Sequence, residues 1–247
     1  MDLETLYEGK QCYVNDRKYK TTEEYIKPFV DIMSKYTDKF IVRAERPAQM
    51  TMDEKSNLDV AYSRVWVQAV MPESECVINH DEVIAMLYGI DIVKPVVKFY
   101  RGMVNRACTN LAVFNPLWLT QQKFTGGEAI NYGVIEPLLE KTNNFLSNIN
   151  AAKAEFMDKD KVSDKMGEWV DKSFRTTFNG KKLPYNMIIN GYKNLMINQK
   201  SRYFVPENRD VSLYEMYNAV TGEITEQKNF MDRFEQTMLV SNIMADA

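Results

Sequence analysis

The stretch Val96–Asn115, VVKFYRGMVNRACTNLAVFN, changes character twice within a short length of chain. It begins apolar, passes through a polar segment of arginine, asparagine and cysteine, and then becomes apolar again. The branched and aromatic residues of Pro95–Val104 predict a β-strand. The polar segment Asn105–Thr109 predicts a turn, because asparagine side chains hydrogen-bond to nearby backbone and tolerate left-handed geometry. We therefore place a strand and turn at the centre of the fold.

The segments before this strand predict a sheet. Phe40–Ala44 and Val60–Met71 are rich in β-branched and aromatic residues, which predicts two strands that pair as a hairpin with a long loop. Cys76–Asn79 predicts a further short strand. Asp81–Tyr88 is interpreted as a short helix that ends at Gly89, because glycine readily adopts the left-handed conformation that closes a helix.

One helix is predicted before these strands. Thr21–Glu24 has the form of a capping box, in which threonine and glutamate satisfy each other's backbone amides. Apolar residues from Tyr25 to Tyr36 follow at helical spacing. Pro28 lacks an amide proton, so it either kinks this helix or lies near its true start.

After the break at Thr125–Gly127 the pattern becomes helical. Apolar residues from Ile135 to Phe156 recur at steps of three and four, which predicts one long helix. Four further helices are predicted: one around Trp169 that ends near Asn179–Gly180, Tyr185–Gln199, one from Asp210–Ser212 to Gly222, and one containing Phe230 and Ile243.

These patterns together predict an α+β fold. We expect a mainly antiparallel N-terminal sheet with one or two helices, followed by a helical C-terminal half. The β-rich region is placed at residues 1–127, and the helical region at 128–247, packed on it as one continuous structural unit. A length of 247 residues is enough to bury a sizeable core.

Positive charge is concentrated in two runs without any acidic residue. Residues 92–127 carry +5 and residues 172–206 carry +7. Because the net charge of the whole chain is −3, the remaining residues carry −15. A merely solvated surface usually mixes charges of both signs, so this separation favours an anionic partner.

Aromatic residues interleave the second basic run, and this combination points to nucleic acid. Lysine and arginine neutralise phosphates, while aromatic rings stack on any base. The alternative is that the aromatics are core and the cations are a solvated helix face. The predicted phosphate contacts are Lys98, Arg101, Arg106, Lys181, Lys182, Lys193, Lys200 and Arg202. The predicted base-stacking residues are Tyr100, Tyr185, Tyr192 and Tyr203.

No catalytic centre is predicted. The sequence has one histidine and three widely spaced cysteines, which excludes multi-histidine metal sites and disulfide frameworks. A thiolate–imidazole pair of Cys108 and His80 lacks an orienting third group, and we interpret Cys108 as a small buried thiol. Glu128, Glu136 and Glu140 could line a helix in a metal nuclease, but no paired acidic motif accompanies them. No glycine-rich phosphate loop is present, and no cofactor is expected.

Location in a reducing cytosol is also expected. The apolar runs are far shorter than the ~20 residues that a membrane-spanning helix needs. The first residues, MDLETLYEGKQ, are acidic and polar rather than those of a signal peptide. We therefore expect a cytoplasmic protein, with no membrane partner.

Two motifs resemble a known family. Gly102–Leu111, GMVNRACTNL, follows a strand, and Leu213–Thr221, LYEMYNAVT, precedes a closing helix. The pair resembles the uncharacterised phage/plasmid-like proteins of phage, prophage and plasmid genomes, over about residues 60–245. That resemblance implies a role in mobile-element replication, recombination or conflict with a host. The layout is also similar to that of phage single-strand annealing proteins, which form rings or filaments and hold single-stranded DNA by its backbone.

These observations lead to three functional hypotheses. The first is a phage-type, non-enzymatic protein of the bacterial host's cytoplasm that binds or anneals single-stranded DNA, or RNA, as a homo-oligomer. The alternative is an effector that inhibits a host defence protein or polymerase through its acidic surface. The third is a metal-dependent nuclease.

Overall fold

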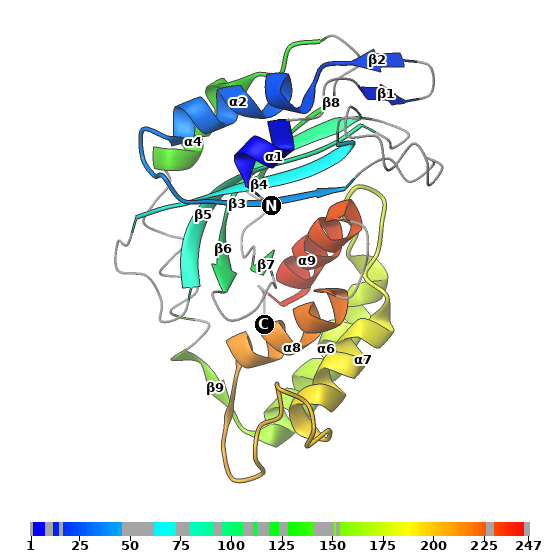
Figure 1. Ribbon diagram of the computed structural model, residues 1–247. Coiled ribbons are helices and arrows are strands. Elements are labelled where there is room, and N and C mark those ends of the chain that lie inside the picture. The colour runs from blue at the N-terminus through cyan, green and yellow to red at the C-terminus, as the bar shows by residue number, and fades with distance from the viewer. Residues whose placement is uncertain are drawn as a thin grey trace. The chain divides into compact units, whose positions relative to one another are not determined.

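The computed structural model describes most of the chain. The described residues are 2–7, 12–14, 17–45, 62–72, 80–90, 95–105, 111–112, 119–123, 128–140, 151, 154–225 and 230–244. The chain forms two compact units. Unit 1 consists of residues 1–75, 82–101 and 118–140, and unit 2 of residues 76–81, 102–117 and 141–247. The architecture is α+β, with the sheet in the N-terminal half and helices in the C-terminal half, as predicted (Figure 1).

Most of the sheet lies in unit 1, whereas its residues 80–81, 102–105 and 111–112 belong to unit 2. Six of the described strands form it, in the order β3-β4-β5-β6-β7, with β8 also paired to β6. The strands are β3 (Phe40–Glu45), β4 (Arg64–Val70), β5 (His80–Gly89), β6 (Val96–Asn105), β7 (Leu111–Ala112) and β8 (Leu119–Lys123). The β3–β4 pairing is antiparallel and aligns Val42 with Val67, which confirms the predicted hairpin.

Helices and a short ribbon complete unit 1. They are α1 (Leu3–Tyr7), the strands β1 (Cys12–Val14) and β2 (Arg17–Tyr19), α2 (Thr22–Met33), the 3₁₀ turn η2 (Tyr132–Val134) and α4 (Ile135–Glu140). Thr21 and Glu24 form the predicted capping box. Pro28 lies inside α2, seven residues into the helix, rather than at its start.

Helix α2 lies over one face of the sheet in unit 1 (Figure 1), and its aromatic side chains pack on β5 and β6. The ring of Tyr25 lies 5.4 Å from that of Tyr88 on β5, and Phe29 lies 6.3 Å from Phe99 on β6. The hydroxyl of Tyr132 donates to the carbonyl of Tyr25 at 2.6 Å. Apart from Tyr132, these rings are 1% exposed or less, so this aromatic layer is part of the core of unit 1.

The prediction of a helix over Asp81–Tyr88 is wrong, because this segment is the strand β5. Its residues are buried without a break from Asp81 to Gly89. A strand that is covered on both faces is apolar on both, so it loses the alternation that distinguishes a strand from a helix.

Helices form most of unit 2. They are α6 (Lys159–Arg175), α7 (Tyr185–Met196), α8 (Leu213–Thr225) and α9 (Phe230–Met244), with a two-stranded ribbon of β9 (Phe156–Met157) and β10 (Val211–Ser212). The hydroxyl of Tyr217 on α8 lies 3.3 Å from that of Ser241 on α9. This contact links α8 to α9 within unit 2.

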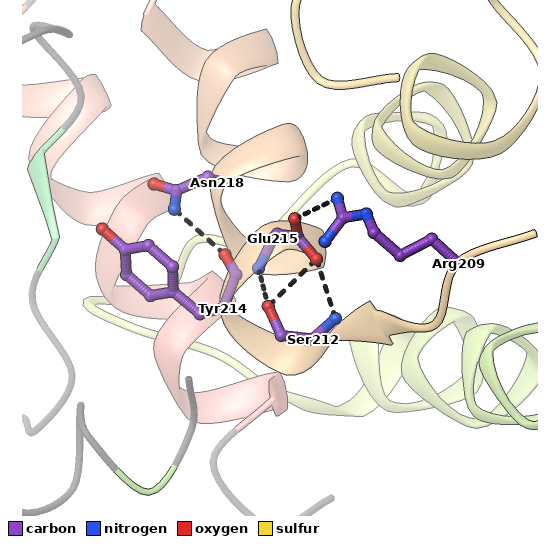
Figure 2. Close-up of polar contacts among 5 residues, drawn as sticks. All are labelled: Arg209, Ser212, Tyr214, Glu215 and Asn218. Atoms are coloured by element: carbon purple, nitrogen blue, oxygen red, sulfur yellow. Dashed lines mark hydrogen bonds and ion pairs between the residues drawn. The ribbon is translucent and has the colours of Figure 1, made fainter. Parts of the chain in front are cut away.

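A polar cap fixes the start of α8 (Figure 2). The amide of Glu215 donates to the hydroxyl of Ser212, and the amide of Ser212 donates to the Glu215 carboxylate at 2.9 Å. Arg209 donates to the other oxygen of the same carboxylate at 2.6 Å. Further along the helix, the amide of Asn218 donates to the carbonyl of Tyr214. The sequence Ser-x-x-Glu thus forms a reciprocal cap that is reinforced by an arginine.

Several helix boundaries differ from the predictions. Helix α6 ends at Arg175, and Asn179–Gly180, where it was expected to end, form a separate turn. Helix α4 ends at Glu140 and Phe156 lies in the strand β9, so no helix runs unbroken from Ile135 to Phe156. Gly222 lies inside α8 rather than at its end, because the ring of Tyr203 packs against it. A side chain at this position would meet the Tyr203 ring at 2.6 Å. The predicted strand at 76–79 lies outside the described residues.

The described part of the chain contains no helix that is long and apolar enough to cross a membrane.

The packing of α7 on α8 yields a prediction about two glycines. A methyl group at Gly191 would lie 2.8 Å from the backbone of Val220, whereas one at Gly167, on α6, would meet nothing within 4 Å. We expect Gly191→Ala to lower the free energy of unfolding by about 1–3 kcal/mol through overpacking. Gly167→Ala should raise it by about 0.5–1 kcal/mol, because alanine loses less backbone entropy in a helix. Urea denaturation of both variants measures this, and equal effects would contradict the packing.

Candidate nucleic-acid interface

Three of the predicted nucleic-acid contacts in the first basic run are buried in unit 1, whereas Lys123 of the same run is exposed. Lys98 and Tyr100 are 0% exposed and Arg101 is 2% exposed. All three lie on β6, whose residues from Val96 to Gly102 are buried. The prediction that they contact phosphates or bases is therefore wrong for this structure. Arg106 lies outside the described residues.

Arg101 has a structural role. Its Nε donates to the carboxylate of Glu82, which is 1% exposed. Its Nη1 donates to the carbonyls of Leu138 and Leu139 at 3.0 and 3.1 Å. The partial negative charge of these carbonyls adds to the charge of the Glu82 carboxylate in compensating the guanidinium. The guanidinium thus joins two strands to α4 within unit 1.

Tyr100 takes part in a buried polar contact. The indole of Trp66 donates to its hydroxyl at 2.6 Å, and the amide of Gln68 lies at 3.5 Å. Burial raises the pKa of Tyr100 far above its ordinary value, and the hydrogen bonds from Trp66 and Gln68 offset this only in part. A ring that is enclosed in this way offers no face for a base.

The second basic run lies in unit 2 and includes a two-residue turn. Phe178 and Lys181 exchange backbone hydrogen bonds of 2.9 and 3.0 Å around Asn179 and Gly180. Both central residues have positive φ, 53° and 76°. Asparagine followed by glycine is the sequence that such a turn favours, because both residues tolerate left-handed backbone. The turn presents Lys181 and Lys182 on its outgoing side.

Lys181 binds carboxylates that come from far along the chain. Its ammonium lies 2.5 Å from Asp232 and 2.8 Å from Glu235, both on α9. Partial burial lowers the pKa of Lys181, but the hydrogen bonds to Asp232 and Glu235 outweigh this and the net pKa is raised. Its charge is thus compensated, and it anchors the turn to α9.

Carboxylates outside the run also compensate two cations on α6. Lys172 pairs with Glu168 at 2.9 Å, and Arg175 pairs with Asp171 at 2.7 Å. The absence of acids from residues 172–206 therefore does not mean an absence of acids nearby, because a helix brings residues four positions apart together.

Three exposed lysines of the run remain without a carboxylate partner among the described residues: Lys182, Lys193 and Lys200. The ammonium of Lys182 donates to the carbonyl of Phe174 at 2.5 Å, which holds it at the C-terminal end of α6. Among the predicted phosphate contacts, these exposed lysines are therefore available to an external anion.

An exposed aromatic pair lies beside Lys182. The rings of Phe174 on α6 and Tyr185 on α7 are stacked, with centroids 5.6 Å apart and planes at 29°. Phe174 is 54% exposed and Tyr185 is 49% exposed. Because large aromatic side chains usually bury most of their area, this solvent-exposed stack is unusual. The sequence marked Tyr185 as a stacking residue but did not single out Phe174, whose exposure depends on how α6 and α7 pack.

The two other tyrosines of the run are less available. The hydroxyl of Tyr192 lies 2.8 Å from that of Ser163 on α6, and this side chain is half-buried. Tyr203 lies between Gly222 and the guanidinium of Arg202, which is 4.7 Å from the ring centroid. We therefore define the aromatic–lysine surface as Phe174, Lys182 and Tyr185, with Lys193 and Lys200 as further exposed cations.

Other predicted chemistry finds no support in the described residues. Within them, no group of three or more histidine, cysteine, aspartate or glutamate side chains could hold a metal ion. Cys108 lies outside them, so its proposed pairing with His80 cannot be placed. No family model, no curated protein and no solved structure matches this chain.

The buried Arg101–Glu82 pair provides a prediction about stability. Glu82→Gln leaves the guanidinium of Arg101 without its counter-charge in a buried setting, which should cost about 3–5 kcal/mol in the free energy of unfolding. Glu45→Gln is the matched control, because Glu45 pairs with Arg64 at 3.3 Å in a partly exposed position. That change should cost at most about 1 kcal/mol. Chemical denaturation compares the two, and similar losses would contradict a structural role for the buried pair.

Proposed function

We propose that unit 2 binds single-stranded nucleic acid through the aromatic–lysine surface. The observation that carries this proposal is the exposed stack of Phe174 and Tyr185 with the Lys182 ammonium beside it. An unpaired base offers a flat face to such rings, and a phosphate offers its charge to the lysine. The recognition would depend on stacking and charge, so it would be tolerant of sequence.

Several features favour a single strand over a duplex. Bases in a duplex are already stacked and present only their edges and the backbone, so an exposed aromatic pair gains little there. The cations of the aromatic–lysine surface are lysines, which act as point charges. Among its described residues it has no arginine, whose planar guanidinium could form two parallel hydrogen bonds to a base edge. Phosphate attraction and base stacking together are the means by which single strands are held without sequence preference.

Salt dependence provides the first test. If Lys182, Lys193 and Lys200 each neutralise one phosphate, the logarithm of affinity for a single-stranded oligonucleotide should fall with the logarithm of salt concentration at a slope of about −2. Changing any one of these lysines to glutamine should reduce the magnitude of this slope by about 0.7. Fluorescence anisotropy at several salt concentrations measures this. Affinity that is insensitive to salt would contradict the proposal.

Stacking provides the second test. Phe174→Ala or Tyr185→Ala should weaken binding of a single strand by about 1–3 kcal/mol. Tyr36→Ala removes an aromatic ring that is 45% exposed on unit 1, so it is the control and should leave affinity unchanged. A duplex of the same sequence should respond little to either change. Equal losses for Tyr36→Ala and Tyr185→Ala would show that the stack is not the binding site.

The two adjacent lysines should separate stability from binding. Lys181→Gln leaves Asp232 and Glu235 without their ammonium and should lower the midpoint of thermal unfolding, because Glu235 is buried. Lys182→Gln loses only a bond to a carbonyl and should weaken nucleic-acid binding at unchanged thermal stability. Thermal denaturation and anisotropy on both variants check this. The opposite pattern would assign the binding role to Lys181.

A further inference from the structure

Asparagine followed by glycine occurs twice in this sequence, at Asn179–Gly180 and at Asn190–Gly191. This dipeptide is the one most prone to deamidation, because glycine has no side chain to hinder attack by its own backbone nitrogen on the asparagine amide. The two copies have the same local chemistry. The structure places them in different settings, one exposed and one packed against another helix.

Asn179 and Gly180 are exposed at the tip of the two-residue turn. Two backbone hydrogen bonds, between Phe178 and Lys181, close that turn. Within the described chain, the Gly180 amide donates to no acceptor. Rotating the Gly180 nitrogen toward the Asn179 side chain therefore requires only a local rearrangement of one surface turn.

Asn190 and Gly191 lie in the middle of α7. Gly191 is buried, and its Cα faces the backbone of Val220 so closely that a methyl group there would clash. The amide of Asn190 also lies 3.4 Å from the carboxylate of Glu223 on α8. The Gly191 nitrogen can reach the Asn190 side chain only if this part of α7 unfolds and leaves α8.

We propose that Asn179 is a deamidation site of the folded protein and that Asn190 is protected. The backbone nitrogen of Gly180 loses its proton and bonds to Cγ of Asn179. The Cγ–Nδ2 bond breaks, and the nitrogen leaves as ammonia, which gives a five-membered succinimide. Water then opens this ring at either carbonyl and yields aspartate or isoaspartate. No oxidant or cofactor takes part.

The new carboxylate would lie at a position that already carries excess negative charge. The Asn179 amide donates to the carboxylate of Glu235 at 3.2 Å, and a carboxylate cannot replace this donor. Lys181 supplies one positive charge to both Asp232 and Glu235, so these three side chains together carry −1. Deamidation makes it −2 and places two carboxylates against each other.

The consequence is a slow, irreversible loosening of the contact between the turn and α9. Aspartate tolerates left-handed backbone nearly as well as asparagine, so the aspartate product keeps the turn and changes only its charge. Isoaspartate also lengthens the backbone and breaks the turn. This inference stands on the turn and on Glu235 and does not rest on the proposed nucleic-acid binding.

Peptide mapping by mass spectrometry tests the site. The full-length folded protein is incubated in warm, mildly alkaline buffer, and the two asparagine–glycine peptides are followed over time. The expected result is deamidation at Asn179 with none at Asn190. In the urea-denatured chain both sites should react at similar rates. Reaction of the folded protein at Asn190 as fast as at Asn179, or at neither while the denatured chain reacts, would overturn the proposal.

Two substitutions test the consequence. Asn179→Asp should lower the midpoint of thermal unfolding and speed amide hydrogen exchange at the start of α9. Asn179→Gly is the control, because it keeps the positive φ, loses the same hydrogen bond and adds no charge. If both variants have the same midpoint and the same exchange at α9, the added charge has no effect and this part of the proposal is wrong.

Discussion

The cost of burying a charge without a partner decides which cations of this chain belong to the fold and which to its surface. Arg101 is enclosed in unit 1, and Glu82 and the last carbonyls of α4 compensate it. Lys181 is held by Asp232 and Glu235 on α9. Compensated cations of this kind cannot be replaced freely, because removing either partner leaves the other charged and poorly solvated. The nucleic-acid interface that we propose consists of the cations left over.

Local patterns predicted much of the fold. The Thr21–Glu24 capping box, the β3–β4 hairpin and the central strand β6 are determined by neighbouring residues, and the structure contains all three. The exceptions have tertiary causes. Strand β5 is covered on both faces and so lacks alternation, and Gly222 serves close packing of Tyr203 rather than the end of a helix.

The candidate site was less predictable than the fold. A run without acids suggests a positive surface only if no carboxylate from outside the run lies beside its cations. Here the preceding turn of α6 and the distant helix α9 both supply such carboxylates. The apolar neighbours of Lys98 indicated a strand, but not that both faces of that strand would be buried. The exposure of Phe174 likewise follows from the packing of two helices, which no single segment encodes.

Lysine labelling, read out by mass spectrometry, tests the division between structural and surface cations most directly. The full-length protein is treated with a small amine-reactive reagent, with and without a single-stranded oligonucleotide. We predict that Lys182, Lys193 and Lys200 are labelled quickly and are protected by the oligonucleotide, whereas Lys98 is labelled only after denaturation. Rapid labelling of Lys98 in the folded protein, or no protection of Lys182 by bound oligonucleotide, would contradict this account.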